Sequence, residues 1–279
     1  MKISVIIPVY NEEDVIGECL ESLSRQTLRD FEVIVVDDGS TDKSMEVVNS
    51  LKIKNFKLKI LLQKHGGAGA ARNLGVGKAG GKILVFVDAD MTFDENFLTN
   101  LTKPIGQGKT KGTFSKEEYV SNWGNVWARA WNVNQNWPAR RRHPKNFGRR
   151  QKVFRAIKRD EFDRVGGFSG GGYTDDYSLS DKLGYLAVEA KGAKFYHKNP
   201  ARLSEVFAQA KWSAKRRYKL GAIGAIAALV RASLVSSFVV GVIKAVRHGM
   251  PQFLIFRIIY NLGATLGILE YHLLGKGYK

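Results

Sequence analysis

Apolar and polar positions in the first hundred residues follow two periods that alternate along the chain. Runs of consecutive apolar residues, typical of strands buried on both faces, alternate with stretches in which apolar residues recur every three or four positions, as on one face of a helix. The predicted strands are Ile3–Val9, Phe31–Val36, Leu58–Leu62 and Lys82–Val87. This alternation predicts an α/β fold, with a mostly parallel sheet and helices on both of its faces.

Polar and glycine residues between the strands mark where the helices begin. Asn11 is expected to cap a helix over residues 12–26, and either Ser40 or Asp42 is expected to cap the next one. Short polar side chains suit these places because they accept hydrogen bonds from the free N–H groups of a first helical turn. The glycine-rich stretch 66–69 is expected to open a third helix, where backbone can approach a phosphate closely.

The pattern changes after the first hundred residues. Strands are predicted at Lys152–Ile157 and Ala193–Tyr196, and the chain is expected to be helical beyond Leu203. Two later segments, Leu220–Ile243 and Pro251–Leu274, are apolar over more than the ~20 residues that span a bilayer. They predict a C-terminal helical hairpin that spans a membrane, lies in its interface, or packs as a soluble pair on the preceding domain.

Charge divides the chain into two parts. The net charge is +18, yet residues 1–100 contain 12 basic and 15 acidic residues, whereas residues 101–279 contain 32 basic and 11 acidic ones. Such a basic block suits nucleic acid, anionic lipid or a phosphorylated substrate. We expect no nucleic acid, because no nucleic-acid-binding motif accompanies the block. Cys19 is the only cysteine, which excludes an internal disulfide, and we expect no signal peptide at the N-terminus.

A stretch rich in tryptophan and arginine lies within the basic part. Trp123, Trp127 and Trp131 recur every four residues, on one face of a helix, and Trp137 and arginines 140–142 follow. Tryptophan and arginine together are typical of a membrane headgroup interface, and arginines also hold phosphate. Packing of the tryptophans on the protein's own core is the third interpretation, and the sequence leaves all three open.

The most informative polar residues end the fourth predicted strand. Asp88-Ala89-Asp90 delivers two carboxylates to the carboxyl end of a buried parallel strand, where open α/β sheets bind their ligands. Paired carboxylates suit a divalent cation that also holds phosphate oxygens. A solvated turn can have the same sequence, so this motif gains meaning only from others beside it.

Four further stretches accompany this motif. They are Val5–Glu12, Val35–Asp42, Gly69–Gly75, and Gly166-Gly167-Phe168 leading to Thr174–Leu179. In this order the five motifs resemble family-2 glycosyltransferases of the GT-A fold, over residues 1 to about 220. The resemblance implies a catalytic domain at residues 1–218, and the two apolar segments predict a membrane-associated hairpin at 219–279. Within the catalytic domain we expect a nucleotide-sugar half, 1–100, and an acceptor half, 101–218.

The resemblance implies a UDP- or GDP-sugar donor bound at the strand ends. Asp38 matches the acid that reads the nucleotide base, although a carboxylate that bonds its own turn has the same sequence context. Tyr10 is expected to pack on the base, and Glu12 to hold the ribose or base. Arg72 is expected to reach the diphosphate, unless it is a solvated helix arginine. The full set expected to contact the donor is Pro8, Tyr10, Glu12, Asp38, Gly67, Arg72, Asp88 and Ala89.

The resemblance also implies a divalent cation, Mg²⁺ or Mn²⁺, for which carboxylate oxygens are suitable ligands. Asp90 is the expected direct ligand, with Asp88 beside the ribose or in the cation's water shell, and His197 on the metal or the diphosphate. Asp176 is the expected general base of an inverting transfer, preceded by Asp175 where the family usually has Glu. With a lipid-phosphate acceptor, which is already ionised, Asp176 would orient the acceptor instead.

Together these expectations describe a membrane-associated, metal-dependent enzyme that transfers a hexose to a lipid-phosphate or lipid-linked glycan acceptor. The hairpin would hold it at the cytoplasmic face of a membrane, with a loose similarity to dolichyl-phosphate mannose synthases. A basic cluster would lie beside either the membrane or the diphosphate, and consists of Lys211, Lys215, Arg216 and Arg217. Two alternatives are a catalytically silent nucleotide-sugar-binding scaffold, and a nucleotidyltransferase, whose Gly-rich basic motif after the first strand this sequence lacks.

Overall fold

The computed structural model describes residues 2–169, 175–216 and 218–275, without the side chains of Asp175 and Asp176. Packing divides the chain into two compact units. Residues 1–119 and 146–197 form the α/β unit, and residues 120–145 and 198–279 form the helical unit. This division does not follow the predicted boundary after residue 218, because Trp131 and Val206 pack into one core with Phe253.

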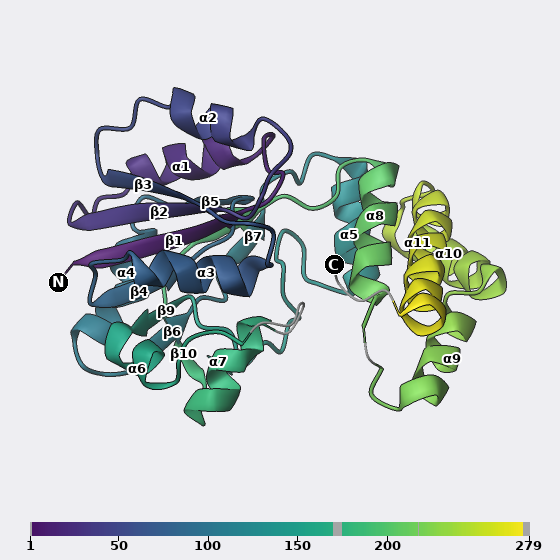
Figure 1. Ribbon diagram of the computed structural model, residues 1–279. Helices are drawn as coiled ribbons and strands as arrows, with labels where there is room; N and C mark the ends of the chain where they lie inside the picture. Colours follow the sequence, from purple (N-terminus) through teal and green to yellow (C-terminus); the bar gives the residue numbers. More distant parts are fainter. Residues whose placement is uncertain (1, 170–174, 217, 276–279) are drawn as a thin grey trace. The chain divides into compact units, whose positions relative to one another are not determined.

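The α/β unit is built on a sheet that has eight strands within the described residues, in the order β3-β2-β1-β4-β9-β6-β10-β8 (Figure 1). Its strands are β1 (Ile3–Val9), β2 (Phe31–Asp37), β3 (Lys57–Leu62), β4 (Ile83–Phe86), β6 (Gly112–Phe114), β8 (Arg150–Gln151), β9 (Ala156–Lys158) and β10 (Ala187–Glu189). β3, β2, β1 and β4 are parallel, whereas β9 runs antiparallel to β4 and β6. The sheet is therefore parallel over the first hundred residues, as predicted, and mixed beyond them. The single strand predicted at 152–157 is replaced by β8 and β9.

Helices cover both faces of this sheet. They are α1 (Ile16–Ser24), α2 (Ser44–Ser50), α3 (Ala68–Gly77), α4 (Phe97–Gly106), α6 (Arg159–Arg164) and α7 (Asp175–Leu183). Neighbouring residues on a strand point to opposite faces, so Val5 and Ile7 share a core with α1 and α4, whereas Ile6 shares one with α3 and α7. The predicted α/β fold with helices on both faces is confirmed.

The carboxyl ends of the parallel strands meet at one edge of the sheet. Val9 of β1 pairs with Asp37 of β2, and β3 and β4 run parallel beside them. Asn11 does not cap a helix as predicted, since α1 begins only at Ile16. Asn11 instead has a left-handed backbone (φ 58°), and its Oδ1 accepts the Thr41 N–H at 2.8 Å. This bond ties the loop after β1 to the loop after β2.

A second sheet, of three strands in the described chain, joins segments that are distant in sequence. It consists of β5 (Met91–Phe93), β11 (Phe195–His197) and β7 (Glu118–Val120), in the order β5-β11-β7. In its register His197 lies opposite Met91, the residue after Asp90. The pairing therefore carries His197 to the carboxyl end of β4, although it is 107 residues from Asp90 in the chain.

The helical unit consists, in its described part, of α5 (Val126–Gln135), α8 (Leu203–Ala214), α9 (Gly221–Arg231), α10 (Leu234–His248) and α11 (Phe253–Leu274). Trp131 is 6% exposed and packs edge-on against Phe256 and Tyr260 of α11. Trp127 and Trp137 pack against the same core. For these three tryptophans, the interpretation of packing on the protein's own core is therefore the one the structure shows.

The backbones of α8 and α11 lie close together. A Cβ on Gly263 would clash with the carbonyl oxygen of Phe207. The predicted basic cluster contributes to the same contact. The ammonium groups of Lys211 and Lys215 form ion pairs with the Glu270 carboxylate of α11, with N–O distances of 2.6 Å and 2.7 Å. One face of α11 is thus fixed inside the helical unit by close backbone packing and ion pairs.

The first long apolar segment is not one straight helix. α9 ends at Arg231, and α10 begins at Leu234 after a bend of 56°, with the Ser233 side chain accepting the Ser236 N–H. In the described part of the chain α11 alone is long and apolar enough to cross a membrane, and a second span exists only if the bent pair counts as one. The predicted hairpin of two long helices is therefore a set of three helices.

Candidate active site

The structure brings several of the residues predicted to hold the donor, together with the predicted metal ligand Asp90, to the carboxyl edge of the sheet. They are Pro8, Tyr10 and Glu12 at and beyond the end of β1, Asp38 after β2, and Asp88, Ala89 and Asp90 after β4. Because β1, β2 and β4 are parallel neighbours, these loops leave the sheet on the same side. Ala89 is buried, so the aspartates on either side of it carry the polar chemistry of this motif.

Asp38 is buried, and its carboxylate accepts hydrogen bonds from the loop after β3. Oδ1 accepts the side-chain amide of Gln63 at 2.6 Å and the Gly66 N–H at 2.8 Å, and Oδ2 accepts the Gly67 N–H at 2.8 Å. The role of turn carboxylate is taken by Asp37, which accepts a backbone N–H of the turn at 2.9 Å. Asp38 thus orders the glycine loop, and the N–H of a nucleotide base would join or replace these donors.

Tyr10 and His65 form an aromatic pair beside Asp38. Their rings stack with 4.2 Å between centroids, and His65 Nδ1 lies 2.9 Å from Asp38 Oδ2. Tyr10 is 44% exposed, so a planar base has access to this pair. His65 was missed in the sequence analysis. The signal that marks it is its position at the end of the third strand, directly before the glycine loop.

Asp88 lies between two arginines. Arg72 Nη2 is 2.7 Å from Asp88 Oδ1, and Arg155 Nη1 is 3.1 Å from Oδ2. Arg72 is 5% exposed and lies over the Phe168 ring, so it is not a solvated helix arginine. Burial alone would raise the pKa of Asp88, but Arg155 and Arg72 outweigh it and hold the pKa well below its usual range. Arg155 precedes β9 and was missed, because no local motif marks it.

His197 lies between two carboxylates. Its Nε2 is 2.5 Å from Asp90 Oδ2, and its Nδ1 is 3.0 Å from Glu118 Oε1. A ring protonated on both nitrogens would donate to both carboxylates. The predicted ligands Asp90 and His197 are therefore in direct contact. Glu118, which orients the ring, was missed because only the three-stranded sheet brings it to this place.

Three carboxylates at this edge influence one another. Burial, followed by the charges of Asp90 and Asp88, raises the pKa of Glu12 to about 7. Asp90 Oδ1 is buried and has no hydrogen-bond partner among the described residues. An unpaired hard oxygen in a region of excess negative charge fits a divalent cation. No group of three His, Cys, Asp or Glu side chains suited to a metal occurs in the described chain, so a cation here would also need oxygens from a bound phosphate.

The glycine motif after α6 is tied to α3. The Asn73 side chain donates to the Phe168 carbonyl and accepts the Phe168 N–H, both at 2.9 Å. Gly167 has a φ of +72°, and a Cβ there would press on the Asn73 side chain. These contacts fix Gly167 and Phe168 against α3. The next described helix in the chain is α7, which begins at Asp175. The side chains of Asp175 and Asp176 lie outside the described residues, so their roles stay predictions.

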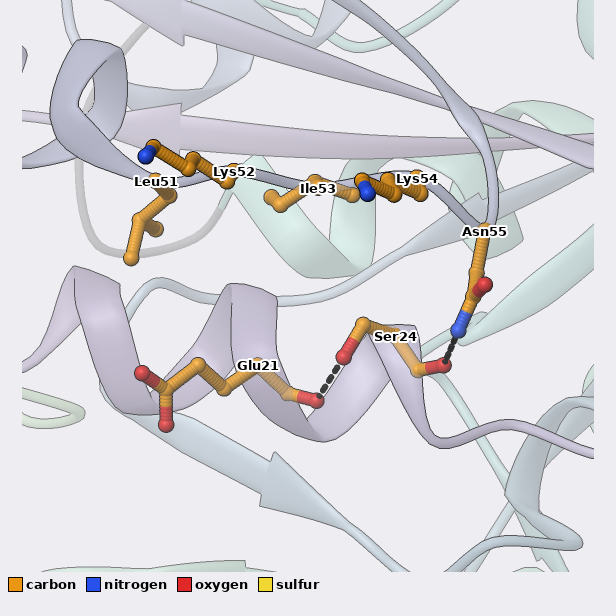
Figure 2. Close-up of a pocket in the computed structure, with 7 residues that line it drawn as sticks. All are labelled: Glu21, Ser24, Leu51, Lys52, Ile53, Lys54 and Asn55. Carbon is orange, nitrogen blue, oxygen red and sulfur yellow. Dashed lines mark hydrogen bonds between the residues drawn. The ribbon is translucent and has the colours of Figure 1, made fainter.

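A cavity of about 340 Å³ lies elsewhere in the α/β unit, at the end of α1. It is lined by Glu21, Ser24 and residues 51–55, and Figure 2 shows the Asn55 side chain bonding the Ser24 carbonyl at its rim. None of the predicted site residues lines this cavity. The candidate active site is therefore the carboxyl edge of the sheet, where the loops that follow β1, β2 and β4 lie.

Comparison with known proteins identifies the family. Residues 4–176 match Glycosyl transferase family 2, a span that runs from β1 to the first turn of α7. The chain belongs to glycosyl transferase family 2. The resemblance carried by the five motifs is thereby confirmed, and the strand-edge residues of this family-2 chain lie inside the matched span, apart from His197.

Two sequence relatives of this family-2 chain are glycosyltransferases by name. The chain is 41% identical over 124 residues to the poly(ribitol-phosphate) beta-glucosyltransferase of Bacillus spizizenii. The matched region is 40% of this chain and 19% of that protein. It is 37% identical over 107 residues to the uncharacterized glycosyltransferase EpsJ of Bacillus subtilis. The matched region is 38% of this chain and 31% of EpsJ. The matched regions therefore span less than a third of each relative's length.

Solved structures of glycosyltransferases share the fold. S. aureus TarS 1–349 in complex with UDP-GlcNAc is similar with a TM-score of 0.57 and 19% identity, over 100% of this chain and 93% of that one. Mannosyltransferase PcManGT from Pyrobaculum calidifontis, in complex with GDP-Man and Mn²⁺, is similar with a TM-score of 0.58 and 21% identity. The similarity covers 93% of this chain and 86% of that one. At such identities the likeness concerns the fold, and it confirms the GT-A type expected for this family-2 chain.

Proposed function

We propose that this protein is a metal-dependent, inverting glycosyltransferase that moves a hexose from a UDP- or GDP-sugar to a lipid-phosphate or lipid-linked glycan acceptor. One observation carries the proposal. The buried carboxylate Asp38, the arginine-held Asp88 and the unpaired oxygen of Asp90 lie at the carboxyl edge of the parallel part of the sheet. Membership of glycosyl transferase family 2 supports the type of reaction.

Asp38 and the Tyr10–His65 pair form the proposed base site. A base N–H would donate to the buried carboxylate while the base lies against the aromatic pair. Gly67 would let the nucleotide approach the backbone, since its φ is +90° and open space surrounds the place of a Cβ. Two proteins of similar fold bind UDP-GlcNAc and GDP-Man, which supports a nucleotide-sugar donor without choosing its base.

Asp90 and His197 are the residues that would hold Mg²⁺ or Mn²⁺, with Asp88 facing the ribose or the cation's water shell. A cation bound there supplies Lewis-acid stabilisation of a diphosphate leaving group. Arg72 and Arg155 keep Asp88 ionised and in place, and Glu118 orients the His197 ring through its other nitrogen. The Mn²⁺ in PcManGT supports a cation in this fold.

Asp176 is the proposed general base. As the acceptor oxygen attacks the anomeric carbon, the bond from that carbon to the diphosphate breaks, and the hydroxyl proton passes to the Asp176 carboxylate. The first turn of α7 is a favourable place for this carboxylate, because the N-terminal end of a helix stabilises negative charge. Asp175 is proposed to contact the acceptor. With an ionised phosphate acceptor, no proton moves and Asp176 orients the nucleophile.

The helical unit is proposed to hold the protein at the cytoplasmic face of a membrane. Of the 21 large apolar side chains that are exposed among the described residues, 17 belong to this unit. Its sequence also has 18 basic residues and only 2 acidic ones. Exposed apolar surface combined with excess positive charge is typical of contact with anionic lipid. The nucleotide sugar is expected in the cytosol, which would place the reaction on that side.

A donor screen tests the reaction. Purified full-length protein is incubated with a lipid extract, Mn²⁺ and single UDP- or GDP-sugars, and the release of nucleotide diphosphate is measured, with EDTA as the control. We expect release from one class of donor, and only with both the extract and the metal. Nucleotide binding without release from any donor would favour a silent scaffold. Release of sugar 1-phosphate in place of nucleotide diphosphate, through cleavage of the bond between the two phosphates of the donor, would favour a nucleotidyltransferase.

A further inference from the structure

The helical unit contains a cavity of about 910 Å³ that is lined by none of the residues proposed to bind the donor, the cation or the acceptor. It lies between α5 with its flanking residues and the turn from α10 to α11. Basic and aromatic side chains gather in its lining, namely Arg129, Lys244, Arg247, His248, Trp123 and Trp137, and no acidic residue lines it. Cations and tryptophans around one cavity suit an anionic group that carries an apolar part.

The cations of the cavity have no carboxylate partner within the described part of the helical unit. The sequence of this unit contains only two acidic residues, Glu205 and Glu270. Glu205 pairs with Arg202, and Glu270 with Lys211 and Lys215, none of which lines the cavity. Gathered cations without a counter-charge attract anions such as phosphate.

Two of these cations differ in how firmly they are held. Lys244 Nζ donates to the Val133 carbonyl at 2.7 Å and to Asn136 Oδ1 at 2.8 Å, which fixes it in the cavity wall. Arg247 is exposed on the last turn of α10, and its guanidinium group has no hydrogen bond or ion pair within the described chain. Arg247 is therefore the cation that is available to a ligand.

The cavity wall continues into an apolar stripe on α10. Val240 and Ile243 line the cavity, and Ile243 is also 59% exposed. Exposed apolar residues recur at helical spacing along the same helix, namely Leu234, Val235, Phe238, Val239, Val242, Ile243 and Val246. A ligand with its anionic end in the cavity would thus meet an apolar surface directly beside it.

We propose that this cavity binds the phosphate headgroup of an anionic lipid, with the lipid chain lying along the exposed stripe of α10. The bent pair α9–α10 then lies in the membrane interface, and α11, which is packed on α8, supports it from within the unit. The role of this lipid, as anchor or as acceptor, rests on the proposed function, whereas its binding does not.

Binding of a soluble short-chain lipid tests this proposal. Dihexanoyl phosphatidic acid, kept below its critical micelle concentration, is titrated into the full-length protein while tryptophan fluorescence is recorded. All five tryptophans belong to the helical unit, so the signal reports on that unit. We expect saturable binding about tenfold or more tighter than that of inorganic phosphate, because the chains bury apolar surface. Absence of saturable binding, or equal affinity for inorganic phosphate, would overturn the lipid site.

Three variants sharpen the test. Arg247→Gln should weaken phosphatidic acid binding about tenfold, the loss expected for one charge-assisted hydrogen bond. Ile243→Ser should weaken binding of phosphatidic acid but leave the affinity for inorganic phosphate unchanged. Lys219→Gln removes the same charge from an exposed residue outside the cavity, and should change binding by no more than about twofold, because salt screens it. Equal losses for Arg247→Gln and Lys219→Gln would mean general electrostatic attraction and would overturn the site.

The same preparation is then titrated with UDP and GDP by calorimetry. Nucleotide binding without lipid binding would refute the lipid site and leave the proposed function unaffected. Lipid binding without nucleotide binding would refute the proposed function and support the lipid site.

Discussion

The two units differ in how their charged side chains find partners. In the α/β unit, Asp38 accepts backbone and side-chain N–H groups of its own chain, and Asp88 lies between two arginines. In the helical unit, 18 basic residues accompany 2 acidic ones, and most of the exposed large apolar side chains of the described chain occur there. One unit satisfies its charges around a small site, whereas the other leaves charge and apolar surface for a partner. This contrast supports the proposal that the α/β unit carries the chemistry and that the helical unit attaches the protein to a membrane.

The largest expected effect tests whether the chemistry belongs to the α/β unit. Asp176→Asn should lower turnover by about 10²–10⁴-fold, the usual range for a general base, and leave donor binding nearly unchanged. Nucleotide diphosphate release and calorimetry measure the two quantities. Asp181→Asn, the same change on an α7 residue that pairs with Lys152, is the matched control. Unchanged turnover in Asp176→Asn would mean that the acceptor is already ionised or that another residue is the base.

The next effect concerns how the α/β unit holds its charges. Arg72→Met should lower the free energy of unfolding by about 2 kcal/mol, because Asp88 keeps only Arg155 as a partner. The loss is smaller than for a fully buried pair, since the Asp88 side chain is 31% exposed. Urea unfolding followed by circular dichroism measures it. Arg25→Met, at an exposed arginine, should cost no more than about 0.5 kcal/mol, and an equal loss in both variants would contradict this account of Asp88.

The raised pKa of Glu12 predicts a pH effect on stability in metal-free buffer. The folded protein holds this proton up to a pKa of about 7, above the ordinary value of 4.5, so stability falls as pH rises between these two values. Glu12→Gln cannot ionise, and should be more stable than wild type by about 1–2 kcal/mol at pH 8 and equal to it at pH 4. Thermal unfolding with EDTA measures the difference. Glu46→Gln on α2 should show no such trend, and a pH-independent gain in Glu12→Gln would rule out the raised pKa.

The smallest effect tests the attachment by the helical unit. Phe238→Ser on α10 should lower partitioning into phosphatidylglycerol vesicles about fivefold, because one interfacial aromatic side chain is lost. Leu62→Ser removes an apolar side chain of similar exposure, 70% against 59%, from the α/β unit, and should leave partitioning unchanged. Vesicle co-sedimentation measures both. Equal losses in the two variants would remove the distinction between the units.

Local pattern was sufficient for the parallel strands of the first hundred residues and for the carboxylates that follow them. Apolar runs located β1, β2 and β4, and parallel strands share a direction, so Asp38, Asp88 and Asp90 had to meet at one edge. The alternation of strands and helices predicted the α/β fold, which the structure confirms, and the five motifs predicted the GT-A type, which the similar structures confirm. Asn11 shows the limit of such local rules, because its side chain joins two loops where a helix cap was predicted.

Two of the missed residues, Glu118 and Arg155, depend on pairing over long distances in the chain. Glu118 reaches His197 from 79 residues earlier through the three-stranded sheet, and Arg155 reaches Asp88 from 67 residues later through β9. The break between α9 and α10 lies inside a continuous apolar run, and its only local signal is the capping residue Ser233. The composition of the helical unit, from two separate stretches of chain, is likewise decided by core packing that no local period encodes.

The central claim is that the strand edge binds a nucleotide diphosphate together with a cation held by Asp90. Calorimetric titration of UDP and GDP into wild type and Asp90→Ala, each with and without Mn²⁺, tests it most directly, with Asp94→Ala as the neighbouring control. We expect Mn²⁺ to tighten binding of one nucleotide about tenfold or more in wild type and Asp94→Ala, and to have no effect in Asp90→Ala. Equal affinity of Asp90→Ala and wild type in Mn²⁺ would contradict the claim.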